Sequence, residues 1–275
     1  YGEDRSDGAY YGVFGHVDVM PLGEGWNSPP LSLTLRDGKL FGRGTLDNKG
    51  PILSNLYALY VLKENGVTFD RPVRIVFGTN EETGFGCVKH YLTKEISPTF
   101  GWTPDCKWPV VYGERGRLKV RVLLPESMVT DLYDFANRKL LHTNHRGEEL
   151  GIAYQDEDFG MMQLRGETFG IEENQHYVEW TMCYPASCTK LDLLNQITMH
   201  LPEKATLEVI SHWAPVLYDK SSKYVQALQQ VYTDVTKSDS IPVTTTGGTY
   251  AKIIPNIIAY GPSFPGQRDI AHLPN

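Results

Sequence analysis

Two apolar runs and one amphipathic run alternate in the first eighty residues of the chain. Residues 10–19 and 72–78 are almost entirely apolar or glycine, which is typical of strands that are buried on both faces. Between them, residues 51–61 carry apolar side chains at helical spacing, with Pro51 suited to the first helical turn and Gly66 to the position after the helix end. This strand–helix–strand order predicts an α/β layer with a largely parallel sheet.

Loops and a hairpin separate these elements. Residues 21–30 are rich in proline and glycine, and residues 42–50 form a glycine-flanked loop that carries Asp47. Alternating side chains on both sides of Asp37-Gly38 predict a hairpin with a type I′ turn. In parallel sheets, ligands gather beyond the carboxyl ends of the strands, so the residues that follow each apolar run are candidates for a site.

The middle of the chain has a different pattern. We expect strands over residues 119–124, 161–165, 178–183 and 206–211, and helices over 131–141 and 191–200. This mixed order indicates a separate α+β unit inserted into the first layer.

The chain then returns to the first layer. A helix over residues 223–235, a glycine turn at Gly247-Gly248 and a strand over 253–260 are expected there. We therefore predict one domain formed by residues 1–116 and 213–275, interrupted by an inserted domain at 117–212.

Acidic and histidine side chains gather at the predicted strand ends and turns. His16 and Asp18 lie two residues apart at the end of the first apolar run, so in a strand they point to the same face. A carboxylate beside a histidine fixes its tautomer and makes it a better metal ligand. The other candidates are Asp47, Glu81, Glu82, Asp105 and His272. Together these residue types predict a two-metal hydrolase site.

The adjacent pair Glu81-Glu82 suits a division of roles. Neighbouring side chains diverge, so one carboxylate can bind metal while the other acts as a general base. Each candidate also has a plain explanation: a hydrogen-bonded histidine at a strand end, an exposed Glu-Glu turn, or loop aspartates in Asx-turns. The joint pattern, rather than any single residue, carries the prediction.

Composition narrows the class of protein. A chain of 275 residues with 41% hydrophobic and 11% aromatic residues forms a folded globular protein. Its net charge of −7 argues against nucleic acid or an anionic membrane surface as a partner. The four cysteines lack CxxC spacing, which favours reduced thiols, and no apolar stretch reaches the roughly 18 residues that span a bilayer. We expect a soluble, cytoplasmic protein, and because both ends look cut, part of a longer one.

Long ordered motifs carry a family resemblance. They are GHVDVMPLG at 15–23, GRGTLDNKG at 42–50 and TNEETG at 79–84. In this order they resemble the di-zinc peptidases that include aminoacylase, carboxypeptidase G and carnosinase. TPD at 103–105, YGERG at 112–116, GGTYA at 247–251 and Ala271-His272 are similar, more narrowly, to the bacterial Xaa-His dipeptidases. The resemblance implies a mixed, largely parallel sheet flanked by helices, with an inserted α+β lid domain.

The resemblance also implies a ligand set for two divalent metal ions. His16 and Asp105 would bind one ion, Glu82 and His272 the other, and Asp47 would bridge them. Zinc is the ion that we expect first, with manganese or cobalt as alternatives, because all three accept these ligands.

Catalytic and substrate-binding roles follow from the same resemblance. Asp18 would hydrogen-bond to His16, and Glu81 would act as the base in hydrolysis by a metal-activated water. Gly247, Gly248 and Thr249 would lie near the substrate carboxylate, although such a turn is also found as a plain strand connection.

The chain departs from the family in the lid. The family's lid histidine, which helps to stabilise the oxyanion, has no counterpart in its usual sequence context, and Cys183 stands where relatives often have an arginine for the substrate carboxylate. We therefore expect altered or weakened carboxylate binding. The interval between Gly116 and Leu150 is short for a full lid, which indicates either omitted residues or a naturally reduced lid. Strand and helix meet there without a turn, which favours omission, so we expect lid residues to be absent between Glu114 and Ser127.

Three functions remain open from the sequence. The first is a metal-dependent dipeptidase that hydrolyses small unblocked dipeptides, as a monomer or homodimer. The second is a deacylase of N-acyl amino acids that uses the same metals. The third is a catalytically weak relative that binds peptide or metal without turnover.

Overall fold

The computed structural model describes residues 1–3, 6–267 and 270–274. The chain divides into two compact units. Unit 1 comprises Tyr1–Tyr112, Tyr218–Val243 and Gly248–Asn275, and unit 2 comprises Gly113–Leu217 and Thr244–Gly247. No helix among the described residues is long and apolar enough to cross a membrane.

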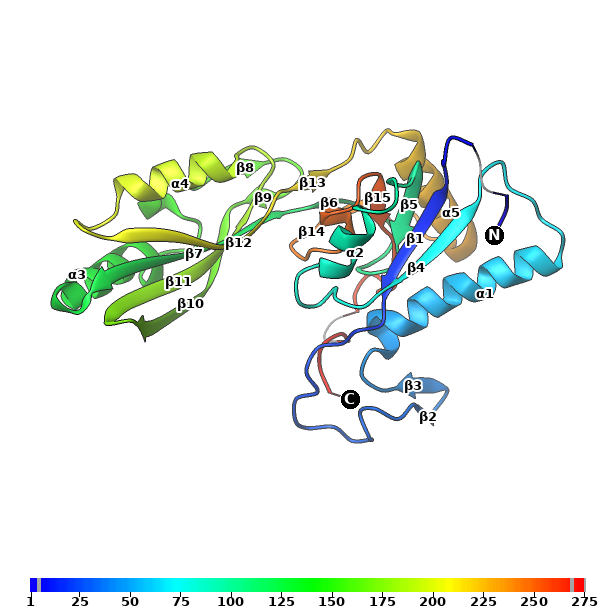
Figure 1. The fold of residues 1–275 in the computed structure, drawn as a ribbon, viewed down its shortest axis with the longest axis horizontal. Coiled ribbons are helices and arrows are strands. Elements are labelled where there is room, and N and C mark those ends of the chain that lie inside the picture. The colour runs from blue at the N-terminus through cyan, green and yellow to red at the C-terminus, as the bar shows by residue number, and fades with distance from the viewer. Residues whose placement is uncertain (4–5, 268–269, 275) are drawn as a thin grey trace. The chain divides into compact units, whose positions relative to one another are not determined.

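A mixed, largely parallel sheet forms the centre of unit 1 (Figure 1). Strand β1 (Tyr11–His16) lies between β4 (Val73–Gly78) and β5 (Phe100–Thr103) and runs parallel to both. Strand β15 (Ile257–Ala259) continues the parallel part beside β5. The full order is β13-β6-β15-β5-β1-β4, with β14 beside β6, where β6 is Val111–Glu114, β13 is Val216–Leu217 and β14 is Val243–Thr245. The α/β class predicted from the sequence is therefore confirmed.

Three helices accompany this sheet: α1 (Gly50–Glu64), α2 (Gly86–Tyr91) and α5 (Lys223–Thr236). Helix α1 packs on β1 through Ile52, which is fully buried. Its other apolar residues are largely exposed, with Tyr57 at 70% and Tyr60 at 57%. The helix itself was predicted, but a buried stripe was not found, because apolar side chains surround α1 on all sides and the sheet covers one side only.

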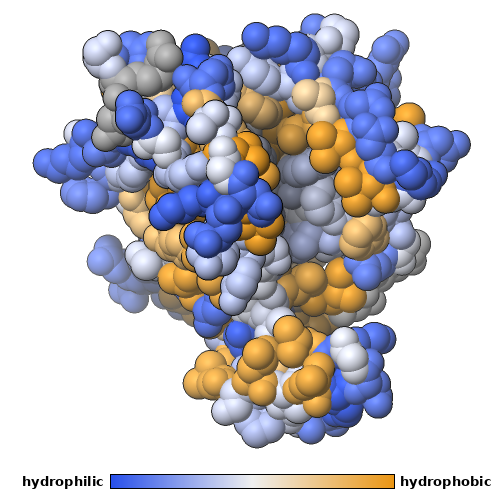
Figure 2. Space-filling view, turned by 90° about the vertical axis from the view of Figure 1, so that its right-hand side faces the viewer, coloured by the Kyte–Doolittle hydropathy of each residue, from blue (hydrophilic) through white to orange (hydrophobic). Residues whose placement is uncertain are grey.

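The predicted hairpin is present in unit 1, with β2 (Thr34–Arg36) and β3 (Lys39–Phe41). Asp37 has φ 51° and Gly38 has φ 71°, as a type I′ turn requires. Its leucines are exposed, and Figure 2 shows hydrophobic atoms over the lowest part of the molecule, at the level where this hairpin lies in Figure 1. Leu35 and Leu40 belong to the hairpin, and the exposed Leu31 and Leu33 directly precede it.

A four-stranded antiparallel sheet forms unit 2, in the order β10-β11-β7-β12. These strands are β7 (Gly116–Pro125), β10 (Gln163–Glu172), β11 (Gln175–Tyr184) and β12 (Thr206–Trp213). Helices α3 (Val129–Ala136) and α4 (Lys190–Met199) supply Leu132 and Leu193 to a core around Trp180. A two-stranded ribbon, β8 (Gln155–Asp156) with β9 (Gly160–Met161), completes the unit.

Strand and helix meet without a turn before Ser127, as the sequence suggested. Strand β7 continues to Pro125 as an inner strand that pairs with β11 and β12. A single helical turn, Glu126–Met128, then leads into α3. The expected absence of lid residues between Glu114 and Ser127 stays a prediction.

Candidate metal centre

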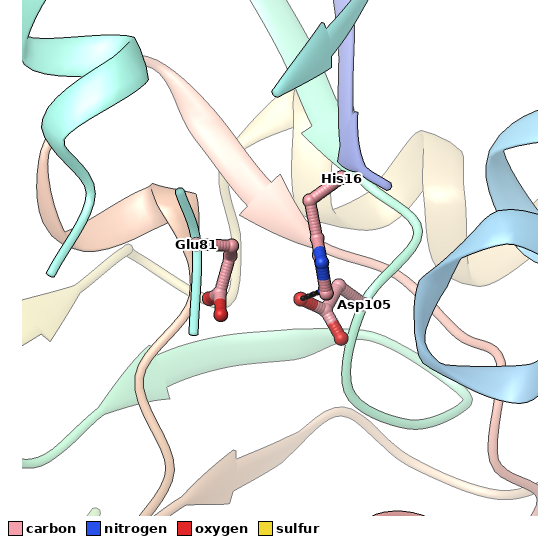
Figure 3. Close-up of side chains that lie close together, drawn as sticks. All are labelled: His16, Glu81 and Asp105. Carbon is pink, nitrogen blue, oxygen red and sulfur yellow. Dashed lines mark ion pairs between the residues drawn. The ribbon is translucent and has the colours of Figure 1, made fainter. Parts of the chain in front are cut away.

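Three parallel strands end at one edge of the unit 1 sheet and bring the candidate residues together. His16 is the last residue of β1, is fully buried, and pairs in register with Gly78, the last residue of β4. Glu81 follows β4 and Asp105 follows β5. Figure 3 shows these three side chains converging, as expected for the carboxyl ends of parallel strands.

Asp47 lies between two imidazoles. Its Oδ1 atom is 2.9 Å from Nε2 of His16, and its Oδ2 atom is 2.7 Å from Nε2 of His272. His16 Nε2 is also 3.5 Å from Oδ2 of Asp105, and His272 Nε2 is 3.4 Å from Oε2 of Glu82. The five predicted metal ligands therefore form one continuous cluster.

Two groups drawn from this cluster and the adjacent Glu81 have ligand atoms close enough to hold an ion. One consists of His16, Glu81 and Asp105, the other of His16, Asp47 and Glu82, and within each group the ligand atoms lie within 4.8 Å of one another. Imidazole nitrogens and carboxylate oxygens are the donors that zinc, manganese and cobalt accept. The cluster therefore fits divalent cations.

The charges of the cluster support the same fit. Burial raises the pKa of Glu81 to about 9, with a further rise from the neighbouring Asp105 carboxylate. Burial alone would lower the pKa of His16, but hydrogen bonds to Asp105 and Asp47 outweigh it and raise the value to about 11. Hydrogen bonds to Asp47 and Glu82 raise the pKa of His272 to about 10. The raised pKa values mean that His16, Glu81 and His272 hold their protons next to the carboxylates of the cluster. A divalent cation would supply the same positive charge.

Asp18 contacts His16 mainly through its backbone. The Nδ1 atom of His16 lies 3.0 Å from the carbonyl oxygen of Asp18 and 3.5 Å from its Oδ1 atom. An Nδ1–H that donates to this carbonyl leaves Nε2 free to face Asp47. The sequence had suggested that the Asp18 carboxylate would make this contact.

Three residues that were not predicted also support the site: Asn48, Tyr250 and Cys87. Asn48 does so through its buried side chain. The side chain of Asn48 is fully buried, accepts a hydrogen bond from the backbone of His16 at 3.3 Å and donates one to the carbonyl of Pro104 at 2.6 Å. It thereby links the end of β1 to the loop that carries Asp105. Its position directly after Asp47 in the glycine-flanked loop was the available signal.

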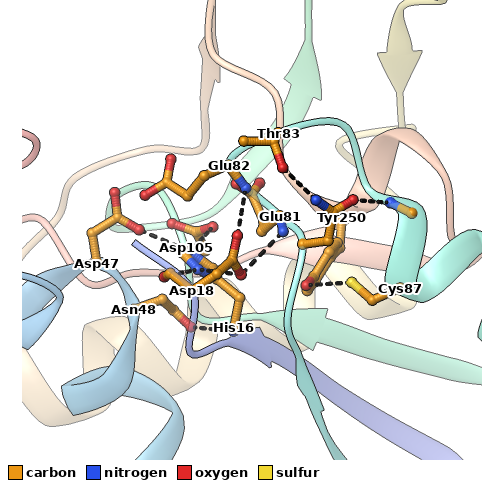
Figure 4. Close-up of polar contacts among 12 residues, drawn as sticks. His16, Asp18, Asp47, Asn48, Glu81, Glu82, Thr83, Cys87, Asp105 and Tyr250 are labelled. Carbon is orange, nitrogen blue, oxygen red and sulfur yellow. Dashed lines mark hydrogen bonds and ion pairs between the residues drawn. The ribbon is translucent and has the colours of Figure 1, made fainter. Parts of the chain in front are cut away.

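Tyr250 is fully buried beside the cluster (Figure 4). Its ring lies edge-on to that of His16, with centroids 6.4 Å apart, and its hydroxyl is 3.2 Å from Sγ of Cys87. The tyrosine belongs to the GGTYA motif, which had been used only for its glycines and threonine.

The predicted substrate-binding turn has a local structural role. Thr249 is buried, and its hydroxyl accepts a hydrogen bond from the backbone of Ala251, which caps the helical turn Tyr250–Lys252. Gly247 closes the last segment of unit 2 and Gly248 opens the last segment of unit 1. In unit 2, Cys183 is fully buried in β11.

Comparison with known proteins matches the chain to one peptidase family and to relatives described as putative dipeptidases. A model described as peptidase family M20/M25/M40 matches residues 12–275. The chain is 40% identical over 114 residues to "Putative dipeptidase YtjP" of Bacillus subtilis (strain 168), a match that covers 42% of this chain and 25% of that protein. It is 24% identical to "Putative dipeptidase SH1171" of Staphylococcus haemolyticus (strain JCSC1435), over 96% of this chain and 78% of the relative. That alignment of 374 positions is longer than this chain, so the relative has internal residues that the chain lacks.

Solved structures share the fold. Human carnosine dipeptidase 1 matches with a TM-score of 0.61 at 15% identity, over 92% of this chain and 73% of that one. The M20 family metallo-carboxypeptidase Sso-CP2 from Sulfolobus solfataricus matches with a TM-score of 0.70 at 15% identity, over 97% and 80% of the two chains.

Proposed function

Because this chain belongs to peptidase family M20/M25/M40, we propose that it is a metal-dependent dipeptidase that acts on small unblocked dipeptides. The observation that carries the proposal is the cluster of two histidines and four carboxylates at the carboxyl edge of the unit 1 sheet. The relatives described as dipeptidases support the choice of substrate. We also propose a cytoplasmic location.

The cluster supports a distribution of ligands over two cations. Asp47 faces His16 with one oxygen and His272 with the other, which suits a bridging carboxylate. Asp105 would join His16 as a ligand of one cation. Glu82 would join His272 as a ligand of the other. Bound zinc, or manganese or cobalt in its place, supplies Lewis acidity that polarises a peptide carbonyl and acidifies a water molecule.

Glu81 is the proposed general base. Its side chain is 8% exposed, and it follows β4 at the edge where His16 and Asp105 lie. In this role its carboxylate accepts a proton from the attacking water and later delivers that proton to the leaving nitrogen, which therefore departs as a neutral amine. His16 holds its Nδ1 proton on the Asp18 carbonyl throughout, because that hydrogen bond does not involve the substrate.

Substrate contacts are proposed for the glycine turn. Gly247, Gly248 and Thr249 would lie near the substrate carboxylate, and unit 2 would act as the lid, with boundaries near residues 117 and 212. The burial of Tyr250 beside His16 supports this assignment, because it brings the segment that follows the turn to the cluster.

A substrate panel tests the proposal. The purified protein is assayed with zinc or manganese against unblocked dipeptides and against N-acetyl amino acids of matched side chains. Cleavage of the dipeptides alone is expected. Cleavage of the N-acetyl compounds alone would replace the proposal with a deacylase, and metal binding without cleavage of either set would replace it with a non-catalytic binding protein.

A further inference from the structure

We propose that Asp18 is a positioning residue whose carboxylate holds the Glu81–Glu82 turn in place by accepting a hydrogen bond from each of the two backbone amides. The inference deepens the proposed function and rests on it, because the turn carries the proposed base. It assigns to the Asp18 side chain a different task from the orientation of His16.

The carboxylate of Asp18 reaches both amides of the turn, one with each oxygen. The backbone N–H of Glu81 donates to Oδ1 at 3.1 Å, and the backbone N–H of Glu82 donates to Oδ2 at 3.1 Å. Figure 4 shows this bidentate contact between the segment after β1 and the segment after β4. Two charge-assisted hydrogen bonds in this arrangement fix both the position and the orientation of the turn.

The nearer partner of the His16 ring is the backbone of Asp18 rather than its carboxylate. The Nδ1 atom of His16 is 0.5 Å nearer to the Asp18 carbonyl oxygen, at 3.0 Å, than to Oδ1, at 3.5 Å. The backbone carbonyl would remain in place if the side chain were changed. The backbone of residue 18 therefore makes the shorter contact with His16, while its side chain makes its two hydrogen bonds to the amides of Glu81 and Glu82.

The far end of the turn is fixed independently of Asp18. The Asn80 side chain accepts a hydrogen bond from the backbone of Gly86 at 2.7 Å, and the Asn80 carbonyl accepts one from Phe85 at 2.8 Å. The backbone of Val17 donates to the carbonyl of Gly78 at 2.9 Å, which continues the β1–β4 pairing up to Asp18. Loss of the Asp18 carboxylate would therefore loosen the two glutamates while the surrounding backbone stays paired.

Backbone amide exchange measures this contact directly. The full chain is compared with Asp18→Asn, which retains one acceptor oxygen, and Asp18→Ala, which retains none, each with and without zinc. In Asp18→Asn, we expect amide exchange to be about tenfold faster at Glu81, at Glu82 or at both positions. In Asp18→Ala, we expect it to be about tenfold faster at both positions. The matched control is Asp219→Asn, which makes the same change in an exposed carboxylate that accepts the backbone amide of Ser221 at 2.8 Å, and it should leave the Glu81 and Glu82 amides unchanged.

Steady-state kinetics give the second readout. With dipeptide at saturating zinc, Asp18→Asn should lower kcat at least tenfold and leave KM within about twofold, because a displaced base affects the chemical step more than substrate binding. Unchanged amide exchange at both glutamates in Asp18→Asn would overturn the inference even if the variant lost activity. A protein that shows faster exchange but cleaves no dipeptide would instead overturn the proposed function and leave the amide contact standing.

Discussion

The Nε2 atom of His16 lies 2.9 Å from the Oδ1 atom of Asp47, although one residue ends a strand and the other belongs to the short helical segment Thr45–Lys49 before α1. The opposite oxygen of the same carboxylate lies 2.7 Å from His272, near the end of the described chain. One carboxylate thus joins three distant segments of unit 1.

Removal of His16 and removal of His272 should weaken metal binding to different degrees. His16→Ala removes a fully buried ligand shared by both candidate groups, so we expect uptake of both zinc equivalents to be lost. His272→Ala removes a half-exposed ligand that contacts only part of the cluster, so one equivalent should be weakened at least tenfold.

Calorimetric titration with zinc measures both effects. His142→Ala, a change at an exposed histidine of unit 2, is the matched control and should bind zinc as the unchanged protein does. Normal binding of two equivalents by His16→Ala would remove the histidine from the proposed ligand set.

Gly78→Ala should destabilise unit 1. A Cβ atom at this position would overlap the hydroxyl of Tyr250, which is fully buried, and would come within 3.2 Å of Sγ of Cys87. Overpacking of this kind costs about 1–3 kcal/mol of unfolding free energy.

A double-mutant cycle checks the cause of this loss. Tyr250→Phe removes the hydroxyl, so Gly78→Ala should cost less in that background, although the ring still leaves little room. Equal costs in the two backgrounds, measured by urea unfolding, would show that the hydroxyl is not the obstacle.

The stability of unit 2 should depend on pH through Glu179. Its carboxylate lies 2.5 Å from Nζ of Lys119 and 3.1 Å from Nη2 of Arg121. Burial by itself would raise the pKa of Glu179, but these two cations outweigh burial and lower it. A lowered pKa in the folded state means that the stabilisation is complete above the ordinary carboxyl value of 4.5 and is lost as the pH falls through the folded-state value.

Glu179→Gln tests this dependence. At pH 7 we expect it to lower the unfolding free energy by about 1.5–3 kcal/mol, the usual worth of hydrogen bonds to charged groups. The difference from the unchanged protein should shrink as the pH is lowered below the ordinary carboxyl value, because both proteins are then uncharged at this position. Glu203→Gln, at an exposed site of the same unit, is the control, and a loss that stayed constant with pH would argue against the charge pair.

The sequence predicted the elements of the site better than their contacts. Apolar runs located β1 and β4, and the residues at their ends identified His16 and Glu81, while the turn motif at 103–105 identified Asp105. Strand patterns and turn residues are local properties of the chain. The task of the Asp18 side chain depends on how two strand ends face each other, which no local pattern contains. The burial of Tyr250 under Gly78 depends in the same way on a contact between distant segments.

The fold was predictable to a similar extent. Helix α1 was located from Pro51 and its apolar spacing, but the spacing could not show that Ile52 alone among its residues is buried. The expected strand over residues 253–260 shortened to β15, because residues 250–252 form a helical turn and Asn256 adopts φ 63°. Side chains in a short apolar run fit either structure, and the surrounding tertiary contacts decide between them.

Glu81→Gln tests the central claim most directly, with two measurements on the same sample: the rate of dipeptide hydrolysis at saturating zinc, and the number of zinc ions bound. Glutamine has nearly the same shape as glutamate but cannot accept the proton of the attacking water, so hydrolysis should fall by a factor of about 10²–10⁴ while two zinc ions remain bound. Hydrolysis at an undiminished rate would contradict the assignment of Glu81 as the base. Loss of both zinc ions together with activity would show that Glu81 holds metal instead.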